Sequence, residues 1–344
     1  MNTGKASLLI LYTGGTIGMV QDSSTGALKP FRFDNILEEV PELKKFGYNL
    51  SSYAFDPPID SSDMKPEVWI KMAEIIESNY DKFDGFIILH GTDTMAYSAS
   101  ALSFMLENLQ KPVIFTGSQL PLGSLRTDAK ENLISSIEIA AAVKNGKPVV
   151  PEVGIFFENR LYRGNRTSKN NTEDFNAFIS GNYPALAESG VHIRFNDNAL
   201  LNPSENPPLI VHKNLDTRLA VLKLFPGLNR HVAEAVLKAE GLRALIIETF
   251  GAGNAPNEPW FISCMKEAVD RGIIVVNITQ CRIGHVAMGT YETSRNLANA
   301  GVIGGSDMTL EAAVTKLMFL LGTYDKKNTI EALITKSIRG EITD

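Results

Sequence analysis

The sequence predicts an α/β protein with two domains, each built around a mainly parallel sheet. Short apolar runs rich in Val, Ile, Leu and Phe alternate with segments of helical period along most of the 344 residues, a pattern typical of parallel α/β structure. The runs are apolar at nearly every position, as expected of strands that helices cover on both faces. The stretch Asn196 to Pro208 is rich in Asn and Pro and has no apolar period, which is typical of a linker. We therefore expect an N-terminal domain over residues 1–195, a linker over 196–212 and a C-terminal domain over 213–344.

The apolar runs and the periodic segments can be assigned in chain order. The expected strands are Ser7–Tyr12, Gly85–Leu89, Pro112–Thr116, Val153–Phe157, Leu219–Phe225, Ala244–Thr249 and Ile273–Ile278. The expected helices are Glu67–Tyr80, Met95–Leu109, Thr127–Lys144, Arg230–Ala239, Trp260–Arg271 and Thr309–Leu321. The second and third of these helices carry an apolar stripe at i, i+3 and i+4. The first helix follows Pro66, a good first-turn residue, and Asp63 is its candidate cap.

Composition and motifs exclude several classes of function. The net charge of −6 and the pI of about 5.5 argue against a nucleic-acid partner, which usually requires clustered basic residues. No apolar run reaches the roughly 18 residues of a membrane span, and the N-terminus lacks a signal-peptide core, so we expect a cytoplasmic protein without a membrane partner. Two cysteines cannot form a disulfide framework or a common zinc pattern, and Cys264 is expected to be a small buried hydrophobe.

The histidines give no reason to expect a metal site. They are scattered along the chain, and the phosphate-binding, zinc-protease and serine-hydrolase motifs are absent. His90 alone lies near a candidate site, and we expect it to be a hydrogen-bonded structural residue rather than a base. The sequence therefore gives no support for metal-based catalysis.

Two glycine turns follow the first two expected strands, and each presents a threonine. LLILYTGGTIG (residues 8–18) presents Thr16, and FIILHGTDT (residues 86–94) presents Thr92 together with Asp93. Ligands of open parallel sheets bind beyond the carboxyl ends of the strands, and glycines in such turns leave amide N–H groups open to a ligand. The threonines are therefore candidate site residues, although Thr92 or Asp93 could instead cap the helix that follows.

Three further segments place polar side chains at comparable positions. Ser118 follows the glycine of TGSQLP, at the end of another expected strand. Lys169 ends the polar, basic segment RLYRGNRTSK, where it is either a surface lysine or a group that moves protons to a hydroxyl nucleophile. Asp60, Ser61 and Ser62 lie in IDSSDM, before a helix, where hydroxyls and backbone N–H groups suit a carboxylate.

Taken together, these segments are similar to those of the bacterial-type L-asparaginases, most closely the cytoplasmic type I branch. The resemblance rests on TGGTIG with HGTDTM and extends through IDSSDM, TGSQLP, RLYRGNRTSK, GNAP, TQC and AGVIGGSDMT, so it covers essentially the whole chain. It implies a larger N-terminal domain, a smaller flavodoxin-like C-terminal domain, and homodimers that usually pair into homotetramers. It also implies hydrolysis of L-asparagine to L-aspartate and ammonia without a cofactor.

The resemblance implies a role for each candidate residue. Thr16 would be the nucleophile that forms an acyl-threonine intermediate, while Thr92, Asp93 and Lys169 would form a second triad that polarises a hydroxyl or a water. Asp93 would also contact the α-ammonium group of the substrate, and Ser61 with its neighbours would hold the α-carboxylate. The full set of implied substrate-binding residues is Asp60, Ser61, Ser62, Gly91, Ser118 and, from a neighbouring subunit, Asn254.

The sequence departs from the family at two places. The segment Gln21 to Phe31, whose first part is expected to be a mobile loop and a candidate lid, contains no tyrosine, although relatives often carry one beside the nucleophile. Some type I relatives bind asparagine at an allosteric site through an arginine and the cysteine of TQC. This chain keeps Cys281, but Glu248 occupies the position of the arginine. Because an acid would repel the carboxylate of the effector, we predict weak or absent cooperativity.

Other functions share these motifs. The amidase subunit of an archaeal-type Glu-tRNA amidotransferase carries both threonine motifs, but it also has an N-terminal β-barrel, whereas this chain begins at its first expected strand. A glutaminase or lysophospholipase side activity is compatible with the motifs. A non-catalytic amino-acid sensor on the same fold is a further alternative, which the retention of Thr16, Thr92, Asp93 and Lys169 does not favour.

Overall fold

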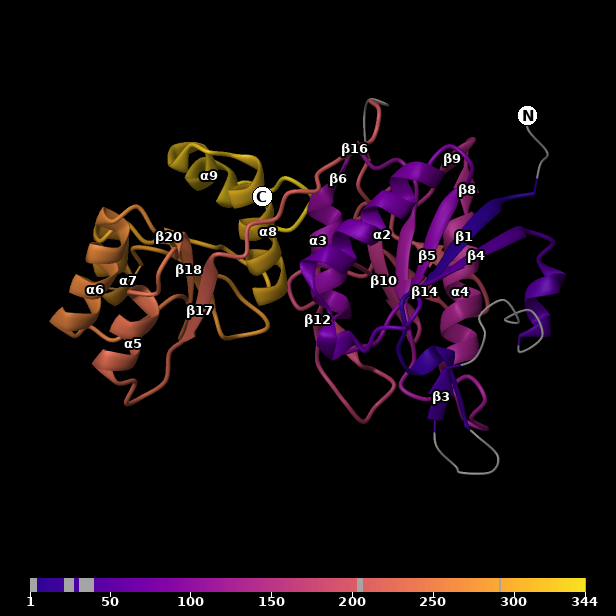
Figure 1. Cartoon of the computed structure of the whole chain (residues 1–344), viewed down its shortest axis with the longest axis horizontal. Helices are drawn as coiled ribbons and strands as arrows, with labels where there is room; N and C mark the ends of the chain where they lie inside the picture. Colours follow the sequence, from indigo (N-terminus) through magenta and orange to yellow (C-terminus); the bar gives the residue numbers. More distant parts are fainter. Residues whose placement is uncertain (1–4, 22–27, 31–39, 203–206, 291, 344) are drawn as a thin grey trace. The chain divides into compact units, whose positions relative to one another are not determined.

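The computed structural model describes residues 5–21, 28–30, 40–202, 207–290 and 292–343. The chain forms two compact units, which Figure 1 draws with the first in indigo to magenta and the second in orange to yellow. The first unit comprises Met1–Ser180 and Pro184–Lys213, and the second comprises Gly181–Tyr183 and Asn214–Asp344. Each unit contains a mainly parallel sheet with helices against it, so the predicted α/β class is confirmed.

The first unit is built around an eight-stranded sheet in the order β15-β14-β11-β10-β7-β5-β1-β4. The parallel part contains β1 (Ser7–Tyr12), β4 (Asn49–Ala54), β5 (Gly85–Leu89), β7 (Val113–Thr116) and β10 (Val153–Phe157). The antiparallel part adds β11 (Arg160–Arg163), β14 (Ala187–Ser189) and β15 (Ile193–Phe195). Tyr12 is paired with Ala54 on one side and with Leu89 on the other, and Leu89 with Thr116. The parallel strands therefore end at the same edge of the sheet.

Helices cover both faces of this sheet. Figure 1 shows α2 (Pro66–Asn79) and α3 (Met95–Met105) on one side and α4 (Ala129–Ala141) on the other. Every residue of α3 except Tyr97 is buried, so burial of this helix includes the predicted apolar stripe and extends beyond it to nearly all of its surface. Its predicted end at Leu109 is wrong, because residues 106–107 leave the helix to pair with residues 210–211.

Short elements complete the first unit. The small strands are β2 (Met19–Gln21), β3 (Leu28–Pro30), β6 (Leu106–Glu107), β8 (Val143–Lys144), β9 (Lys147–Pro148), β12 (Ser168–Lys169), β13 (Phe178–Ile179) and β16 (Ile210–Val211). β2 pairs with β3, so the candidate lid lies between paired strands, and its residues 22–27 fall outside the described part of the chain. Since β16 pairs with β6, residues 210–211 belong to the first unit, and the chain passes to the second after Lys213.

The second unit contains a four-stranded parallel sheet in the order β17-β18-β19-β20. Its strands are β17 (Leu219–Lys223), β18 (Ala244–Thr249), β19 (Ile274–Thr279) and β20 (Ile303–Gly304). Its helices are α5 (Arg230–Leu237), α6 (Pro259–Asp270), α7 (Glu292–Asn299), α8 (Leu310–Thr323) and α9 (Lys327–Ile334). The layering is that of a flavodoxin-like domain, but the strand order is sequential, without the reversal that marks a topological switch point.

The burial of Cys264 agrees with the sequence. Cys264 is buried in the core of the second unit, as predicted, and Cys281 is exposed.

The predicted cap of α2 is wrong. Asp63 does not cap this helix: the N-cap residue is Lys65, and the side chain of Asp60 instead accepts a hydrogen bond from the backbone N–H of Ser62. None of the described helices combines the length and the apolar character that a membrane crossing requires.

Candidate active site

Four turns meet at the carboxyl edge of the parallel strands of the first unit. A Cβ atom on Gly15 would lie only 2.5 Å from the backbone nitrogen of Gly91, and one on Gly14 would lie 2.1 Å from the carbonyl oxygen of Ile59. A Cβ atom on Gly117 would lie 2.4 Å from the carbonyl oxygen of His90. These separations are too short for any side chain, so the glycines are needed to let the turns pack backbone against backbone.

The turn that carries Thr16 is anchored to the neighbouring strand β5. Thr13 donates two hydrogen bonds to the carbonyl of Leu89, from its amide at 3.0 Å and from its hydroxyl at 2.9 Å. Gly14 and Gly15 then have φ values of +141° and +90°, which lead the chain into a short helix that begins at Thr16. Thr16 is only partly buried, so its hydroxyl sits on a rigid turn within reach of solvent and of a ligand.

The second threonine belongs to a cluster with an acid and a base. The Lys169 Nζ atom donates to Thr92 Oγ1 at 2.8 Å and to Asp93 Oδ1 at 2.5 Å. The side chain of Lys169 is 18% exposed, whereas that of Asp93 is 60% exposed. The ammonium group is therefore largely withdrawn from water while the carboxylate faces it, and the reading of Lys169 as an ordinary surface lysine is wrong.

The helix that follows does not use these residues as caps. The N-cap residue of α3 is Thr94, and no side chain makes a capping hydrogen bond there. The Thr94 hydroxyl instead donates to the carbonyl of Ser61 at 2.6 Å. The alternative role of Thr92 or Asp93 as a helix cap is thus excluded, and Thr94 ties the two neighbouring turns together.

Lys169 is held in place by a buried framework. It lies in β12, which pairs with β13 and follows a short helical turn (residues 164–166) packed against α3. Below this turn, Arg163 forms a 2.6 Å ion pair with Glu152, and both side chains are less than 5% exposed. Arg163 also donates to the carbonyl of Ala199 at 2.7 Å. These contacts hold Arg163, at the end of β11, immediately before the short turn that leads to Lys169.

The IDSS segment separates into two parts. Ser61 is buried, and its Oγ atom would lie 2.4 Å from a Cβ atom on Gly91, so the serine lies against the second glycine turn. Asp60 and Ser62 are exposed and contact each other, because the carboxylate of Asp60 accepts from the amide and from the hydroxyl of Ser62, both at 2.9 Å. The backbone hydrogen bond from Ser62, followed by that from its side chain, lowers the pKa of Asp60.

His90 is buried beneath the second turn. Its Nδ1 atom lies 2.7 Å from the carbonyl oxygen of Gly91, and its Nε2 atom lies 2.8 Å from Ser98 Oγ. Burial lowers the pKa of His90 from 6.5 to about 4, so the ring is neutral at neutral pH. The prediction of a hydrogen-bonded structural histidine is confirmed.

Two candidate residues have other surroundings. Ser118 is buried at the end of β7, and its hydroxyl donates to the carbonyl of Leu120 at 2.6 Å, within its own loop. Asn254 lies in the second unit, on the turn that follows β18, where its backbone bonds to Phe250 and its Oδ1 atom accepts from the Thr293 hydroxyl at 2.9 Å. Sequence reasoning missed Thr94, Ser98 and the pair Arg163–Glu152, because their contacts depend on which elements are neighbours in space.

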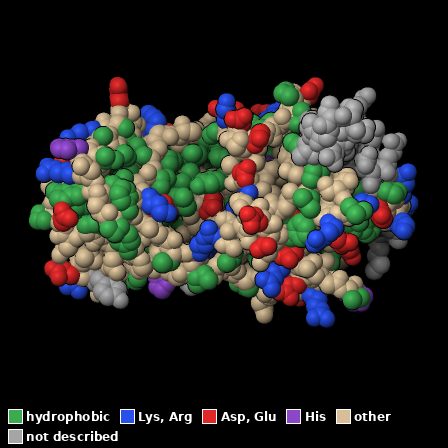
Figure 2. All heavy atoms as spheres, turned by 90° about the horizontal axis from the view of Figure 1, so that it is seen from below, with side chains coloured by type: hydrophobic (Ala, Val, Ile, Leu, Met, Phe, Trp, Pro, Cys, Tyr) green, Lys and Arg blue, Asp and Glu red, His purple; other side chains and the backbone are tan. Residues whose placement is uncertain are grey.

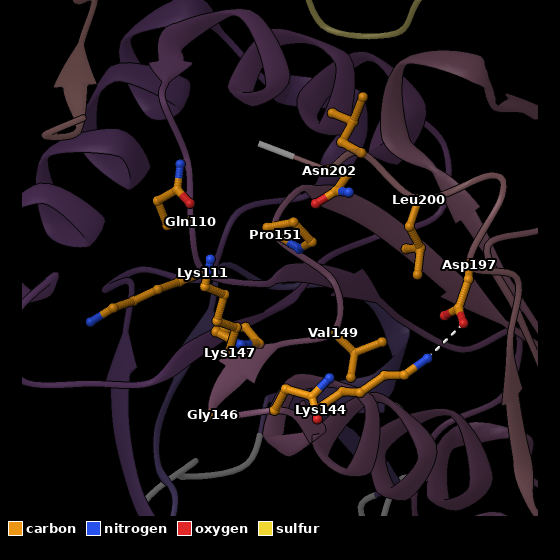
Figure 3. A pocket seen from close by; sticks show the side chains of 13 residues that line it. Gln110, Lys111, Lys144, Gly146, Lys147, Val149, Pro151, Asp197, Leu200 and Asn202 are labelled. Carbon is orange, nitrogen blue, oxygen red and sulfur yellow. Dashed lines mark hydrogen bonds and ion pairs between the residues drawn. The ribbon is translucent and has the colours of Figure 1, made fainter. Parts of the chain in front are cut away.

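A separate hollow lies at the opposite edge of the same sheet. It encloses about 760 Å³ and is lined by residues 110–111, 144–149, 151, 197 and 200–202. Figure 3 shows Lys144 directed toward Asp197, with which it forms an ion pair at 2.6 Å. Residues 110–111 and 151 precede β7 and β10, so the hollow is at the amino ends of the strands and is distinct from the site of the threonines.

Comparison with known proteins gives consistent results. Family models match residues 7–201 as "Asparaginase, N-terminal" and residues 218–334 as "Glutaminase/Asparaginase C-terminal domain". The chain is 46% identical to L-asparaginase 1 of Escherichia coli K12, with 98% of each chain covered. It is similar to the crystal structure of L-asparaginase I from Vibrio cholerae, with a TM-score of 0.90, 42% identity, and coverage of 99% of this chain and 100% of that one. The thermostable L-asparaginase of Thermococcus kodakarensis gives a TM-score of 0.89 and 33% identity, with 98% and 99% covered.

Proposed function

The chain belongs to the asparaginase family, and from this we propose that it hydrolyses L-asparagine to L-aspartate and ammonia through an acyl-threonine intermediate on Thr16. The observation that carries the residue assignment is the contact between the two glycine turns, since it brings the turn of Thr16 against the turn that begins the Thr92–Asp93–Lys169 cluster. An attacking hydroxyl, N–H donors for an oxyanion and a proton source for leaving ammonia are what amide hydrolysis requires.

The two half-reactions follow from this arrangement. The Thr16 oxygen forms a bond to the carbon of the side-chain amide, and the carbon–nitrogen bond breaks as the nitrogen takes up a proton and leaves as ammonia. Lys169 donates to Thr92, so the Thr92 hydroxyl can pass its proton to the leaving group while Lys169 replaces it. The proton that Thr16 loses is taken up by the pair Thr92 and Lys169, so this pair ends the step in the protonation state in which it began. Water then hydrolyses the ester, which releases L-aspartate and restores Thr16.

The charges of the site suit an amino-acid substrate. The exposed carboxylate of Asp93 can pair with the α-ammonium group, while its other contact, Lys169, remains largely buried. Ser61 lies against Gly91, at the start of a short helical turn, where a hydroxyl and backbone N–H groups favour the α-carboxylate. Asp60, Ser62, Ser118 and Asn254 complete the proposed substrate-binding set.

We also propose that the two compact units act as the two domains of a cytoplasmic homo-oligomer, either a dimer or a dimer of dimers. The full-length similarity to L-asparaginase 1 of E. coli supports this proposal. Light scattering after size-exclusion chromatography would measure the mass of the assembly. A monomer at the concentration of the activity assay would contradict the proposal.

The catalytic assignment can be tested by ammonia release from L-asparagine and from L-glutamine. Thr16→Ala, Thr92→Val and Lys169→Met should each abolish most of the activity. The matched controls are Thr217→Ala, an exposed threonine of the second unit, and Lys144→Met, from an exposed ion pair, and both should retain it. Rapid quenching with mass spectrometry should find an aspartyl ester on the peptide that contains Thr16. Ammonia release by Thr16→Ala at the wild-type rate would refute the mechanism.

The same assay separates the alternatives. A non-catalytic sensor would bind asparagine and release no ammonia. A Glu-tRNA amidotransferase subunit would need a charged tRNA as its substrate. The surface does not favour tRNA binding, because acidic and basic side chains are interspersed on the face shown in Figure 2 and the net charge is −6. Preference between asparagine and glutamine depends on about one methylene of pocket depth, worth ~1–3 kcal/mol, so both substrates must be measured side by side.

A further inference from the structure

A chain of buried hydrogen bonds runs from the core of the first unit to the turn that carries Thr92. Trp69 Nε1 donates to Ser98 Oγ at 2.8 Å, Ser98 Oγ lies 2.8 Å from His90 Nε2, and His90 Nδ1 lies 2.7 Å from the carbonyl oxygen of Gly91. Trp69, Ser98 and His90 are 5%, 0% and 1% exposed. Water therefore does not compete for these contacts, and the three side chains form one continuous path from α2 and α3 to the turn.

The chemistry of the end groups fixes the direction of every bond in this path. The Gly91 carbonyl can only accept, so His90 Nδ1 must carry the hydrogen. Since the ring is neutral, Nε2 is the acceptor and the Ser98 hydroxyl donates to it. The remaining lone pairs of Ser98 accept from the indole N–H of Trp69, which can only donate. Each donor has an acceptor, so the path has a single consistent arrangement.

This arrangement determines where the next amide points. The only cis peptide bond in the described part of the chain is Asp56–Pro57, so the bond between Gly91 and Thr92 is trans, with its C=O and N–H on opposite sides. His90 holds the carbonyl toward the core, so the Thr92 N–H faces away from the core. Among the described residues the structure shows no acceptor for this N–H, and a flip of the peptide would leave the buried His90 donor unpaired, which is unfavourable.

We propose that His90 is a positioning residue that holds the Gly91–Thr92 peptide so that the Thr92 amide donates to the oxyanion of the tetrahedral intermediate. The inference rests on the proposed function, because the oxyanion is the one formed when Thr16 attacks an amide. His90 does not touch the substrate in this scheme. It acts through the carbonyl of Gly91, and Ser98 and Trp69 act through His90.

The test compares two substitutions of the same residue. The amide nitrogen of Asn can take the place of His Nδ1, whereas Leu has no donor. His90→Leu should lower kcat by about 100-fold or more, the usual cost of one oxyanion donor, and leave KM within about threefold, because the donor acts mainly in the transition state. His90→Asn should recover about 10-fold of the lost kcat and remain below the wild type, because it restores the donor to Gly91 but lacks the contact with Ser98.

A second pair of variants keeps the inference testable if His90→Leu does not fold. Ser98→Ala should lower kcat by about 10-fold, because His90 loses the partner that fixes its ring. Ser103→Ala is the matched control, since Ser103 lies on the same helix, is buried, and donates to the carbonyl of Ala99 at 2.8 Å, away from the turn. Its kcat should equal that of the wild type.

The outcomes separate this inference from the proposed function. An active wild type with unchanged kcat in Ser98→Ala and in folded His90→Leu would overturn the inference alone. Equal losses in His90→Asn and His90→Leu, or losses confined to KM, would also overturn it, because they indicate general damage or altered ground-state binding. A wild type that releases no ammonia would overturn the proposed function, and the inference with it.

Discussion

A methyl group on Gly15 should disable the site more than it unfolds the protein. Gly15 has a φ of +90°, where a residue with a Cβ atom is strained by about 1–2 kcal/mol. The new Cβ atom would also lie 2.5 Å and 2.6 Å from the nitrogen and Cα atoms of Gly91. Overpacking of this kind adds about 1–3 kcal/mol, and because both partners are backbone, one glycine turn must move away from the other. We expect Gly15→Ala to lower the free energy of unfolding by about 2–5 kcal/mol in total.

The matched control is Gly146→Ala. Gly146 has a φ of +79° in the same unit, but nothing lies within 4 Å of the position of its Cβ atom, so it should show only the strain of about 1–2 kcal/mol. Urea unfolding would measure both stabilities, and an ammonia assay would measure kcat/KM. Because a displacement of about 1 Å can cost 100-fold in rate, kcat/KM should fall by about 100-fold in folded Gly15→Ala and stay unchanged in Gly146→Ala. Equal kcat/KM in the two variants would refute the backbone contact as the element that aligns the turns.

Three further predictions concern stability and saturation. Because the folded protein keeps His90 neutral down to a pH of about 4 while the unfolded chain protonates it below 6.5, stability should fall by about 3 kcal/mol as the pH decreases through that window. Urea unfolding should show a smaller decrease in His90→Asn, and parallel pH profiles would contradict this. Lys316 and Glu341 form an ion pair with both side chains 0% exposed, so Glu341→Gln should cost about 3–5 kcal/mol. The exposed pair Lys144–Asp197 is the control, and Asp197→Asn should cost less than about 1 kcal/mol. Asparagine saturation should be hyperbolic, because the acidic side chain of Glu248 would repel the carboxylate of an asparagine bound as an effector, and a clearly sigmoidal curve would count against this.

The sequence predicts the buried strands of both sheets because their signal is local. β1, β5, β10 and β18 begin and end at the predicted residues, since each is a short apolar run bounded by polar or turn residues. β4 gives no such signal: five of its six residues are exposed at the edge of the sheet, so nothing in its composition requires burial. The end of α3 is also missed, because Leu106 leaves the helix for a pairing with residues more than a hundred positions later.

The same distinction applies to the candidate site. The glycine turns and the polar residues beyond them are readable from the sequence, because a turn after a buried strand is a local feature. Which turns touch is not readable, since it depends on the order of the strands: β1 lies between β4 and β5, and β5 lies between β1 and β7. That order places Gly14 against Ile59 and Gly15 against Gly91.

His90 shows how burial decides what a reactive residue type can do. A histidine beside a threonine and an aspartate would ordinarily be the first choice for a general base. Here its two nitrogens are occupied by Gly91 and Ser98, and burial keeps the ring neutral with a pKa of about 4, so it can neither reach a substrate proton nor hold one at neutral pH. In the proposed mechanism the proton chemistry belongs to the half-exposed group of Thr92, Asp93 and Lys169, where the ammonium is shielded and the carboxylate faces the solvent. The histidine can influence the reaction only through the backbone that it holds, which is why its replacement should alter kcat rather than the pH at which the enzyme works.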